Sequence, residues 1–389
     1  MFAARGALAP ALPPAAYGDP AFFAREAAGV FGVGVDGTRR FLPGVAMWHL
    51  VATTFQLARP GDFVATDVVG VPVLVRNVSE TATPRLAAFL NVCLHRQSVL
   101  ELPGTGNRDA LRCRYHGWEY APDGELAKLP DGPSFRGFKV GGRRLCTLRV
   151  ETLGPLVFVS GADDAPPLRD WLAPLAEDLA RFYDRPLVPV GVRVTEADVN
   201  WKIVVENAVE SYHVPLVHPG TYRDYRSETL HDHRITDSST RYADLEPMST
   251  TRSGRAASLL ARVLMKAPDQ ARFRHAHLFP NLLFYFGELY CDVAVVTPLS
   301  PTRMRHTAFG FAPDGLRAPR LMAPLRDLWG KTIWWYGSKI FKEDGAAWRG
   351  VQAGVRAAEV AGVLSAREER VAAFQRYIAE HVPTTHDGA

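Results

Sequence analysis

The chain has 389 residues, of which 47% are hydrophobic and 22% are charged, and its formal net charge is +4. This composition is typical of a globular protein with room for two domains, and it excludes a coiled coil, a disordered tail and a small disulfide scaffold. The charges are dispersed without a basic block, so we do not expect the chain to bind nucleic acid.

The sequence shows neither a membrane span nor a clear secretory signal. No stretch approaches the roughly 18 uninterrupted apolar residues that a span requires. The apolar N-terminus is interrupted by Pro10, Pro13 and Pro14. Four cysteines are too few for a disulfide framework in a chain of this length. We therefore expect a cytoplasmic protein, with Cys146 and Cys291 buried as small apolar residues.

Short β-like runs predict an all-β domain between about Trp48 and Val159. The runs at 62–65, 71–75, 86–90 and 154–159 are separated by turn signals. After Asp164 the pattern changes to a helical stretch, and we place a domain boundary there. The remaining sequence predicts a helix over 200–212, strands over 277–298 and 307–312, and a helical region over about 321–361. This order favours an α+β fold in which helices pack on an antiparallel sheet.

A first set of ligand-type residues lies in the β domain. Cys93-x-His95 is followed after seventeen residues by Cys113-x2-His116, and each half lies in a loop-forming stretch. Two thiolates and two imidazoles suit a tetrahedral zinc ion or a two-iron cluster. A zinc finger usually has both cysteines before both histidines, and unrelated core residues are the third interpretation.

A second set lies in the segment from Asn200 to Pro219. If this segment is helical, Glu206, Glu210 and His213 share a face, and Pro215 ends the helix before His218. The helix end and the following turn can then bring both imidazoles to one metal. Two histidines and one carboxylate are the ligands of non-haem Fe(II) oxygenases.

Both sets together resemble the large subunit of Rieske non-haem iron oxygenases, over roughly residues 45–352. The resemblance implies that Cys93 and Cys113 hold one iron of a [2Fe–2S] cluster and that His95 and His116 hold the other. It also implies that His213 and His218 are ligands of a separate mononuclear Fe(II).

The resemblance assigns further residues near that iron. Asn207 matches an asparagine beside the metal, and Glu210 matches the acid that bridges to a cluster histidine of the neighbouring subunit. The third ligand is expected from a Glu343-Asp344 pair followed by Gln352, and Asp344 is favoured over Glu343. On a helix, Asp344, Trp348 and Val351 share one face, and Glu343 points in another direction. Glu206 is either a supporting acid or a solvated or salt-bridged helix position.

The family resemblance implies a fold and an assembly. The expected domains are an N-terminal segment over 1–45 that packs on the catalytic domain, a Rieske β domain over 46–163, and a helix-grip catalytic domain over 164–389. The family forms head-to-tail homotrimers, in which electrons pass between subunits. No G-x-G-x-x-G dinucleotide motif follows a strand here, so a ferredoxin or flavin reductase must be a separate chain.

The expected activity is monooxygenation, either hydroxylation or oxidative demethylation, of a small apolar, aromatic or quaternary-ammonium substrate. Ring cis-dihydroxylation is the alternative within the family, and a non-catalytic electron-transfer or zinc-binding protein is the alternative outside it. We expect the pocket to be walled by 221–254, 279–290 and 334–336. The pairs His231/His233 and His275/His277 have no partner motif, so we expect them on the surface or in the pocket wall.

Overall fold

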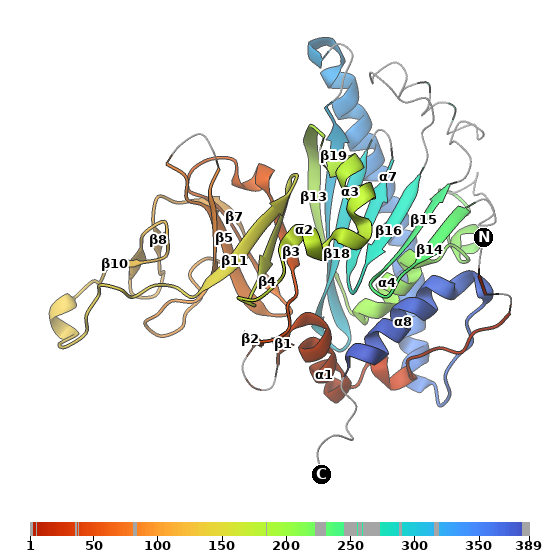
Figure 1. The fold of residues 1–389 in the computed structure, drawn as a ribbon, viewed down its shortest axis with the longest axis horizontal. Coiled ribbons are helices and arrows are strands. Elements are labelled where there is room, and N and C mark those ends of the chain that lie inside the picture. Colours follow the sequence, from red (N-terminus) through yellow and green to blue (C-terminus); the bar gives the residue numbers. More distant parts are fainter. Residues whose placement is uncertain are drawn as a thin grey trace. The chain divides into compact units, whose positions relative to one another are not determined.

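The computed structural model describes residues 3, 4, 6–35, 37, 39–80, 84–183, 185–221, 231–244, 255, 259, 273–287, 290–314 and 319–382. They form two compact units, Phe31–Trp171 and Met1–Val30 with Leu172–Ala389. Figure 1 shows that the first unit consists mainly of strands, whereas the second has helices against a large sheet. The predicted α+β fold with an all-β first part is therefore confirmed. Among the described helices, none combines the length and apolarity of a membrane span.

The unit Phe31–Trp171 is built on an antiparallel sheet in the order β3-β12-β11-β6-β5-β4-β7. Its strands are β3 (His49–Thr53), β4 (Asp62–Val68), β5 (Val71–Asn77), β6 (Leu86–Leu90), β7 (Gly104–Asn107), β11 (Thr147–Leu153) and β12 (Leu156–Ser160). A smaller sheet in the order β10-β9-β8 comprises β8 (Leu111–Arg112), β9 (Glu119–Tyr120) and β10 (Leu126–Lys128). Each β-run predicted from the sequence overlaps a strand, because the runs are rich in valine, leucine and phenylalanine that pack inside the sheet.

Two short elements complete this unit at its ends. β1 (Val33–Gly34) pairs with β2 (Arg40–Phe41), and the short helix α2 spans Leu168–Trp171. Every residue of β12 is buried, as expected for a central strand covered on both faces.

The second unit contains an antiparallel sheet in the order β13-β19-β18-β17-β16-β15-β14. Its strands are β13 (Leu187–Ala197), β14 (His231–Ile235), β15 (Ser239–Asp244), β16 (Arg274–Leu278), β17 (Leu282–Phe286), β18 (Cys291–Ser300) and β19 (Arg303–Pro313). Its helices are α1 (Pro20–Phe31, which runs into the first unit), α3 (Ala176–Tyr183), α4 (Trp201–Val209), α5 (Val214–Val217), α7 (Pro319–Ala357) and α8 (Glu369–His381). The sequence analysis did not predict α1, α8 or β13 to β15.

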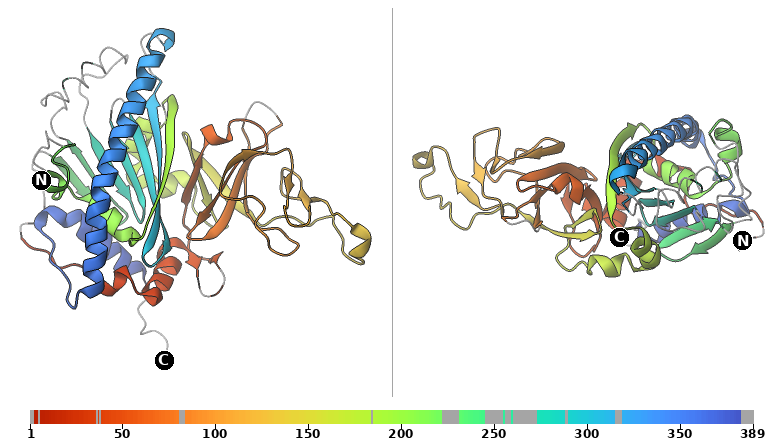
Figure 2. Two further views of the ribbon diagram at one scale, coloured as in Figure 1. Left: turned by 180° about the vertical axis from the view of Figure 1, so that it is seen from behind. Right: turned by 90° about the horizontal axis from the view of Figure 1, so that it is seen from above.

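The two faces of this sheet are covered by different helices. On one face, Tyr183 of α3 packs edge-on against Phe284, Phe286 and Phe311. The long helix α7 crosses the other face (Figure 2). A Cβ atom at Gly310 of β19 would lie 2.5 Å from the Trp334 ring of α7, so glycine there allows the helix to approach the sheet.

Candidate functional site

The two Cys/His segments form two loops of the same design. The Cys93 amide donates to the Ser98 carbonyl, and the Gln97 amide donates back to the Cys93 carbonyl. The Cys113 loop repeats both bonds with Trp118 and Gly117. The fifth residue of each loop has a positive φ, 59° at Gln97 and 72° at Gly117. Each loop therefore presents its cysteine and its histidine from a tight turn whose backbone bonds are satisfied within the loop.

The cysteines of these loops are buried, and the histidines lie side by side. The His95 and His116 ring centroids are 4.5 Å apart, and the His95 ring stacks on Trp118 at 4.9 Å. Tyr120 Oη lies 3.1 Å from Cys93 Sγ, so its hydroxyl can donate to a thiolate there. His95 Nδ1 is buried and has no hydrogen-bond partner among the described residues. An orphaned imidazole nitrogen beside two buried thiols fits a metal cluster.

The geometry of the four residues argues against a single zinc ion. Ligands of one tetrahedral zinc lie within about 4 Å of one another. Among the described residues, no three of Cys93, His95, Cys113 and His116 bring their ligand atoms within 4.8 Å of one another. A two-iron cluster holds its two pairs of ligands further apart.

The second site is built at the end of α4. Asn200 caps this helix, since its side chain accepts from the Lys202 amide at 2.9 Å. Lys202 is fully buried and pairs with Glu26 of α1 at 2.6 Å, and Trp201 Nε1 donates to the same carboxylate. Gln352 of α7 accepts from the Asn200 amide. The start of α4 is thus fastened to the N-terminal segment and to α7.

The predicted helix over 200–212 is too long. α4 ends at Val209, and Glu210 has the extended backbone angles φ −123° and ψ 166°. Glu210 and His213 therefore do not share a helix face with Glu206. Pro215 does not end a helix either, because it lies in the first turn of α5, where its missing N–H is not needed. His218 follows α5 directly.

The chain nevertheless brings the three expected iron ligands together. The ligand atoms of His213, His218 and Asp344 all lie within 4.8 Å of one another. Asp344 Oδ1 is 3.0 Å from His218 Nε2 and 3.5 Å from His213 Nε2. This oxygen is buried and has no hydrogen-bond partner among the described residues. Two imidazoles and an unsatisfied carboxylate oxygen facing one point fit an Fe(II) ion.

Each histidine of this group is oriented through its Nδ1 atom. His218 Nδ1 donates to Glu343 Oε2 at 2.7 Å, and Thr221 Oγ1 donates to the same oxygen at 2.6 Å. Burial opposes the charged form of Glu343, but these two hydrogen bonds outweigh it and lower the pKa of the carboxyl. His213 Nδ1 donates to Glu210 Oε1. Both rings therefore carry their lone pair on Nε2, the tautomer that a metal needs. Asn207 Nδ2 also lies 3.1 Å from His213 Nε2, so a metal would take the place of that contact.

Sequence reasoning placed Asn207 and Asp344 near the metal but missed the roles of their neighbours. Asn207 Nδ2 lies 3.1 Å from the His213 ring, and its Oδ1 accepts from Trp348 Nε1. Glu343, which we expected to point elsewhere, contacts His218. Trp348 is buried as expected, whereas Val351 is exposed. Only the adjacent Glu-Asp pair in the sequence signals that both acids belong to this site.

Glu206 lies outside the group of metal ligands. Its carboxylate accepts hydrogen bonds from Tyr17 Oη at 2.5 Å and Gln375 Nε2 at 3.1 Å. Burial raises the pKa of Glu206 to about 7, although these hydrogen bonds oppose the shift. It is therefore neither solvated nor a partner of the candidate ligands, and it joins α4 to η1 (Pro14–Tyr17) and α8.

Expectations about other residues were right only in part. His275 and His277 are buried, which excludes the surface and leaves the pocket wall of the two expected positions. Cys146 is exposed, whereas Cys291 is buried as expected. Trp335 is exposed. Most of the expected pocket wall over 221–254 lies outside the described residues.

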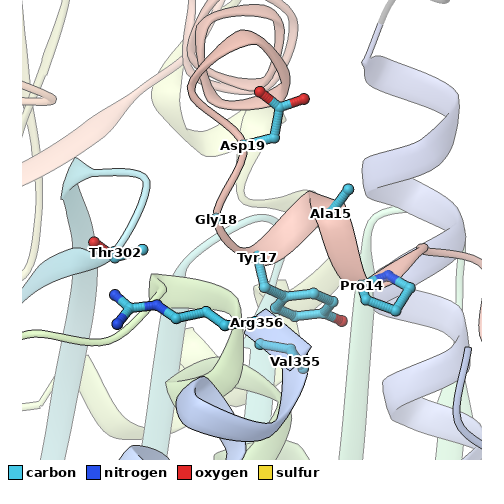
Figure 3. Close-up of a pocket in the computed structure, with 8 residues that line it drawn as sticks. All are labelled: Pro14, Ala15, Tyr17, Gly18, Asp19, Thr302, Val355 and Arg356. Carbon is cyan, nitrogen blue, oxygen red and sulfur yellow. The ribbon is translucent and has the colours of Figure 1, made fainter. Parts of the chain in front are cut away.

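A cavity of about 380 Å³ lies apart from the candidate ligands (Figure 3). It is lined by Pro14, Ala15, Tyr17, Gly18, Asp19, Thr302, Val355 and Arg356. None of these side chains contributes to the group of two histidines and Asp344. The cavity is therefore not the candidate catalytic pocket.

Two family models match the chain. Residues 47–140 match the Rieske [2Fe-2S] domain, and residues 177–384 match the ring hydroxylating alpha subunit catalytic domain. The second match alone covers more than half of the chain.

Curated relatives match part of the chain. The carnitine monooxygenase oxygenase subunit of Acinetobacter pittii (strain PHEA-2) is 32% identical over 176 residues, which are 44% of this chain and 46% of that protein. The glycine betaine monooxygenase oxygenase subunit of Pseudomonas aeruginosa is 35% identical over 175 residues, 44% of this chain and 39% of that protein. The anthranilate 1,2-dioxygenase large subunit of Burkholderia cepacia is 30% identical over 179 residues, 44% and 42% of the two chains. The matched region thus spans less than half the length of each of these relatives.

Solved structures share the fold over nearly the whole chain. A quaternary ammonium Rieske monooxygenase superposes with a TM-score of 0.75 and 22% identity, covering 95% of both chains. Naphthalene 1,2-dioxygenase from Rhodococcus sp. superposes with a TM-score of 0.72 and 20% identity, covering 95% of this chain and 94% of that one. With the family matches, this fold shows that the chain belongs to the Rieske-type ring-hydroxylating oxygenases as an alpha subunit, a family whose cofactors are a [2Fe–2S] cluster and a mononuclear iron.

Proposed function

We propose that this chain is the terminal oxygenase of a multicomponent system and that it monooxygenates a small organic substrate. Cys93, Cys113, His95 and His116 hold the cluster, and His213, His218 and Asp344 hold the iron. The proposed functional division is an N-terminal segment over 1–45, a Rieske domain over 46–163 and a catalytic domain over 164–389. The proposal depends most on one observation, the approach of His213, His218 and Asp344 to a common point.

The iron, when bound, supplies the site at which O2 is reduced with electrons from the cluster. The protein residues hold that site in one geometry. Glu343 and Glu210 fix the tautomers and orientations of His218 and His213 through their Nδ1 atoms. Trp348 fixes the Asn207 amide against the His213 ring. Asp344 provides the single negative charge among the three ligands.

Glu210 has a second role in the proposal. It lies between the helix that carries Asn207 and the loop that carries His213, and its carboxylate holds the His213 ring. A neighbouring subunit's cluster histidine can donate to the same carboxylate in a head-to-tail homotrimer, and electrons then pass from that cluster to this iron. A separate ferredoxin or flavin reductase supplies the electrons.

The named activities of the relatives support monooxygenation of a quaternary ammonium compound as the first choice. Proteins named carnitine and glycine betaine monooxygenases match this chain at 32% and 35% identity. Ring cis-dihydroxylation is the second choice, because the anthranilate 1,2-dioxygenase large subunit matches at 30% identity over a region of similar length.

Turnover under labelled oxygen tests the proposal. The protein is incubated with a ferredoxin reductase system, NADH, ¹⁸O2 and, in separate reactions, carnitine, glycine betaine and anthranilate. We expect product with one labelled oxygen from an ammonium substrate, no product without the reductase, and no product from His213→Ala. A product with two labelled oxygens would show that the reaction is dihydroxylation rather than monooxygenation. Sustained turnover without a reductase would contradict the proposal.

A further inference from the structure

A row of polar and aromatic side chains runs across the sheet face that α7 covers. Strand pairing places the following residues at one level, from β13 to β14: Gly191, Gly310, Asp292, Tyr285, His275, Tyr242 and His233. Directly paired residues of adjacent strands point to the same face of a sheet. Cβ atoms at Gly191 and Gly310 would meet the Trp334 ring of α7, so the whole row faces the α7 side (Figure 2).

The opposite face of the same strands is apolar. Cys291 and Val293, which flank Asp292 in β18, are completely buried, and Phe286 pairs with Cys291 on the Tyr183 side. The sheet therefore does not need a carboxylate at position 292 for its packing. An acid that points into the interior of this fold calls for another explanation.

Burial outweighs the groups that stabilise the charge of Asp292, which are Arg193 and a backbone hydrogen bond. Its Oδ1 atom is buried and accepts no hydrogen bond from the described residues. Burial raises the pKa of Asp292 to about 7, although Arg193 acts in the opposite direction. A carboxylate with a buried, unpaired oxygen favours its neutral form over its ionised form. A bound ligand that carries positive charge would favour the ionised form instead.

Two cations lie near this row: Arg370, 4.3 Å from the centroid of the Tyr242 ring, and Arg193, which is engaged by α7. Arg193 Nη1 donates to Ser338 Oγ at 2.6 Å and to the Trp334 carbonyl at 3.4 Å. Its guanidinium lies over the Trp334 ring, 4.5 Å from the centroid. Arg193 is thus held toward the helix, and it makes no ion pair with Asp292.

The row is less buried than its neighbour on the same face of the sheet. Asp292, Tyr285 and Tyr242 are partly exposed, whereas the adjacent row on the same face is fully buried: His277, Leu283, Ala294 and Ala308. Tyr285 packs edge-on against His275 at 4.7 Å, and Tyr242 stacks on the other side of that ring at 5.5 Å. Burial lowers the pKa of His275 well below its usual value, so this imidazole stays neutral.

We propose that Asp292 recognises an organic cation in the substrate pocket, with Tyr285 and the neighbouring aromatic rings beside the positive charge. This inference rests on the proposed oxygenase function and adds the residue that selects the substrate. A carboxylate and electron-rich ring faces are the groups that attract an ammonium ion in a partly desolvated site. Trp334, at the level of this row, and Asp344 are ten residues apart in α7, a rise of about 15 Å, so Asp292 lies outside the group of iron ligands.

Equilibrium binding separates this inference from the oxygenase proposal, because it needs no turnover. Isothermal titration calorimetry on the full chain with both cofactors compares four probes of similar size: benzylammonium, benzyltrimethylammonium, benzyl alcohol and benzoate. The wild-type protein should bind both cations at least tenfold more tightly than the alcohol or the anion. Asp292→Asn should weaken the binding of both cations at least tenfold. Its affinity for benzyl alcohol should stay within about twofold of that of the wild type.

Two further variants make the test specific. Asp232→Asn removes an exposed carboxylate from β14 of the same sheet, and it should leave all four affinities unchanged. Asp292→Glu keeps the charge and should keep the preference for cations. Iron content and the cluster spectrum must match the wild type in every variant. The inference is overturned if benzoate or the alcohol binds as tightly as the cations, or if Asp292→Asn binds the cations as the wild type does. Failure of carnitine turnover with intact cation binding would contradict the proposed function instead.

Discussion

Glu343 offers a direct test of how the candidate iron site is held. Its Oε2 atom accepts from His218 Nδ1 at 2.7 Å and from Thr221 Oγ1 at 2.6 Å, and its pKa is lowered by these bonds. Glu343→Gln keeps the shape of the side chain but removes the charge. Hydrogen bonds to a carboxylate are about twice as strong as those to a neutral amide. The variant should therefore hold the His218 ring less firmly.

The expected loss of Fe(II) affinity follows from the hydrogen bond between Glu343 and the candidate ligand His218. Substituting the partner of a metal-bound histidine typically reduces metal affinity by about 10–100-fold, or about 1.4–2.7 kcal/mol. Thr221→Val removes one of the two hydrogen bonds to Glu343 and leaves its charge. The loss of Fe(II) binding free energy in Thr221→Val should be smaller, about 0.5–1.5 kcal/mol.

Competition with a coloured Fe(II) chelator measures this affinity, and the cluster spectrum of the same sample serves as an internal reference. Asp327→Asn removes an exposed carboxylate from the same helix and is the matched control. An affinity of Glu343→Gln within twofold of the wild type would refute the reasoning. Loss of the cluster signal together with the iron would show that the variant damages the fold rather than one ligand.

Three other substitutions test separate parts of the structure. Tyr120→Phe removes the hydroxyl that lies 3.1 Å from Cys93 Sγ, and the reduction potential of the cluster should fall by tens of millivolts, because the bond stabilises the more negative reduced state. Gly310→Ala would place a Cβ atom 2.5 Å from the Trp334 ring, so the unfolding free energy should fall by about 1–3 kcal/mol, seen as a lower Tm. Glu206 has a pKa of about 7 against an ordinary value of 4.5, so its contribution to stability is complete below about pH 4.5 and is lost as the pH rises through 7. Glu206→Gln should therefore reduce the fall in Tm between pH 5 and pH 8.

Each of these predictions has a control or a contrary outcome. An unchanged potential in Tyr120→Phe would mean that the hydroxyl does not donate to the thiolate. Gly337→Ala adds a methyl group to the same helix as Trp334 where nothing lies within 4 Å, and it should raise Tm slightly. Equal Tm losses in Gly310→Ala and Gly337→Ala would contradict the close approach of α7 to β19. An identical pH dependence in Glu206→Gln and the wild type would assign that dependence to other groups.

The sequence predicted those features that depend on nearby residues. The strands of the first unit followed from runs of β-branched and aromatic residues, and both loops of the Cys/His set followed from their spacing. The end of α4 did not follow, because periodicity continues through Glu210 while the backbone becomes extended there. His213 and His218 still meet, since α5 turns the chain back after α4.

Long-range contacts were beyond the sequence pattern. Asp344 was identified only through the family resemblance, and Glu343 reaches His218 across 125 residues of sequence. Lys202 pairs with Glu26, which lies in an N-terminal helix that the sequence did not predict. Such partners become visible only when the chain is folded.

Electron paramagnetic resonance of the dithionite-reduced protein, together with metal analysis, shows whether one chain holds two separate iron sites. The measurement is made with iron and zinc quantified on the wild type and on His213→Ala. The account predicts a rhombic signal with the low average g-value of a histidine-ligated cluster and about three irons per chain. In His213→Ala it predicts the same signal with about two irons. Zinc without that signal, or loss of the signal in His213→Ala, would contradict the account.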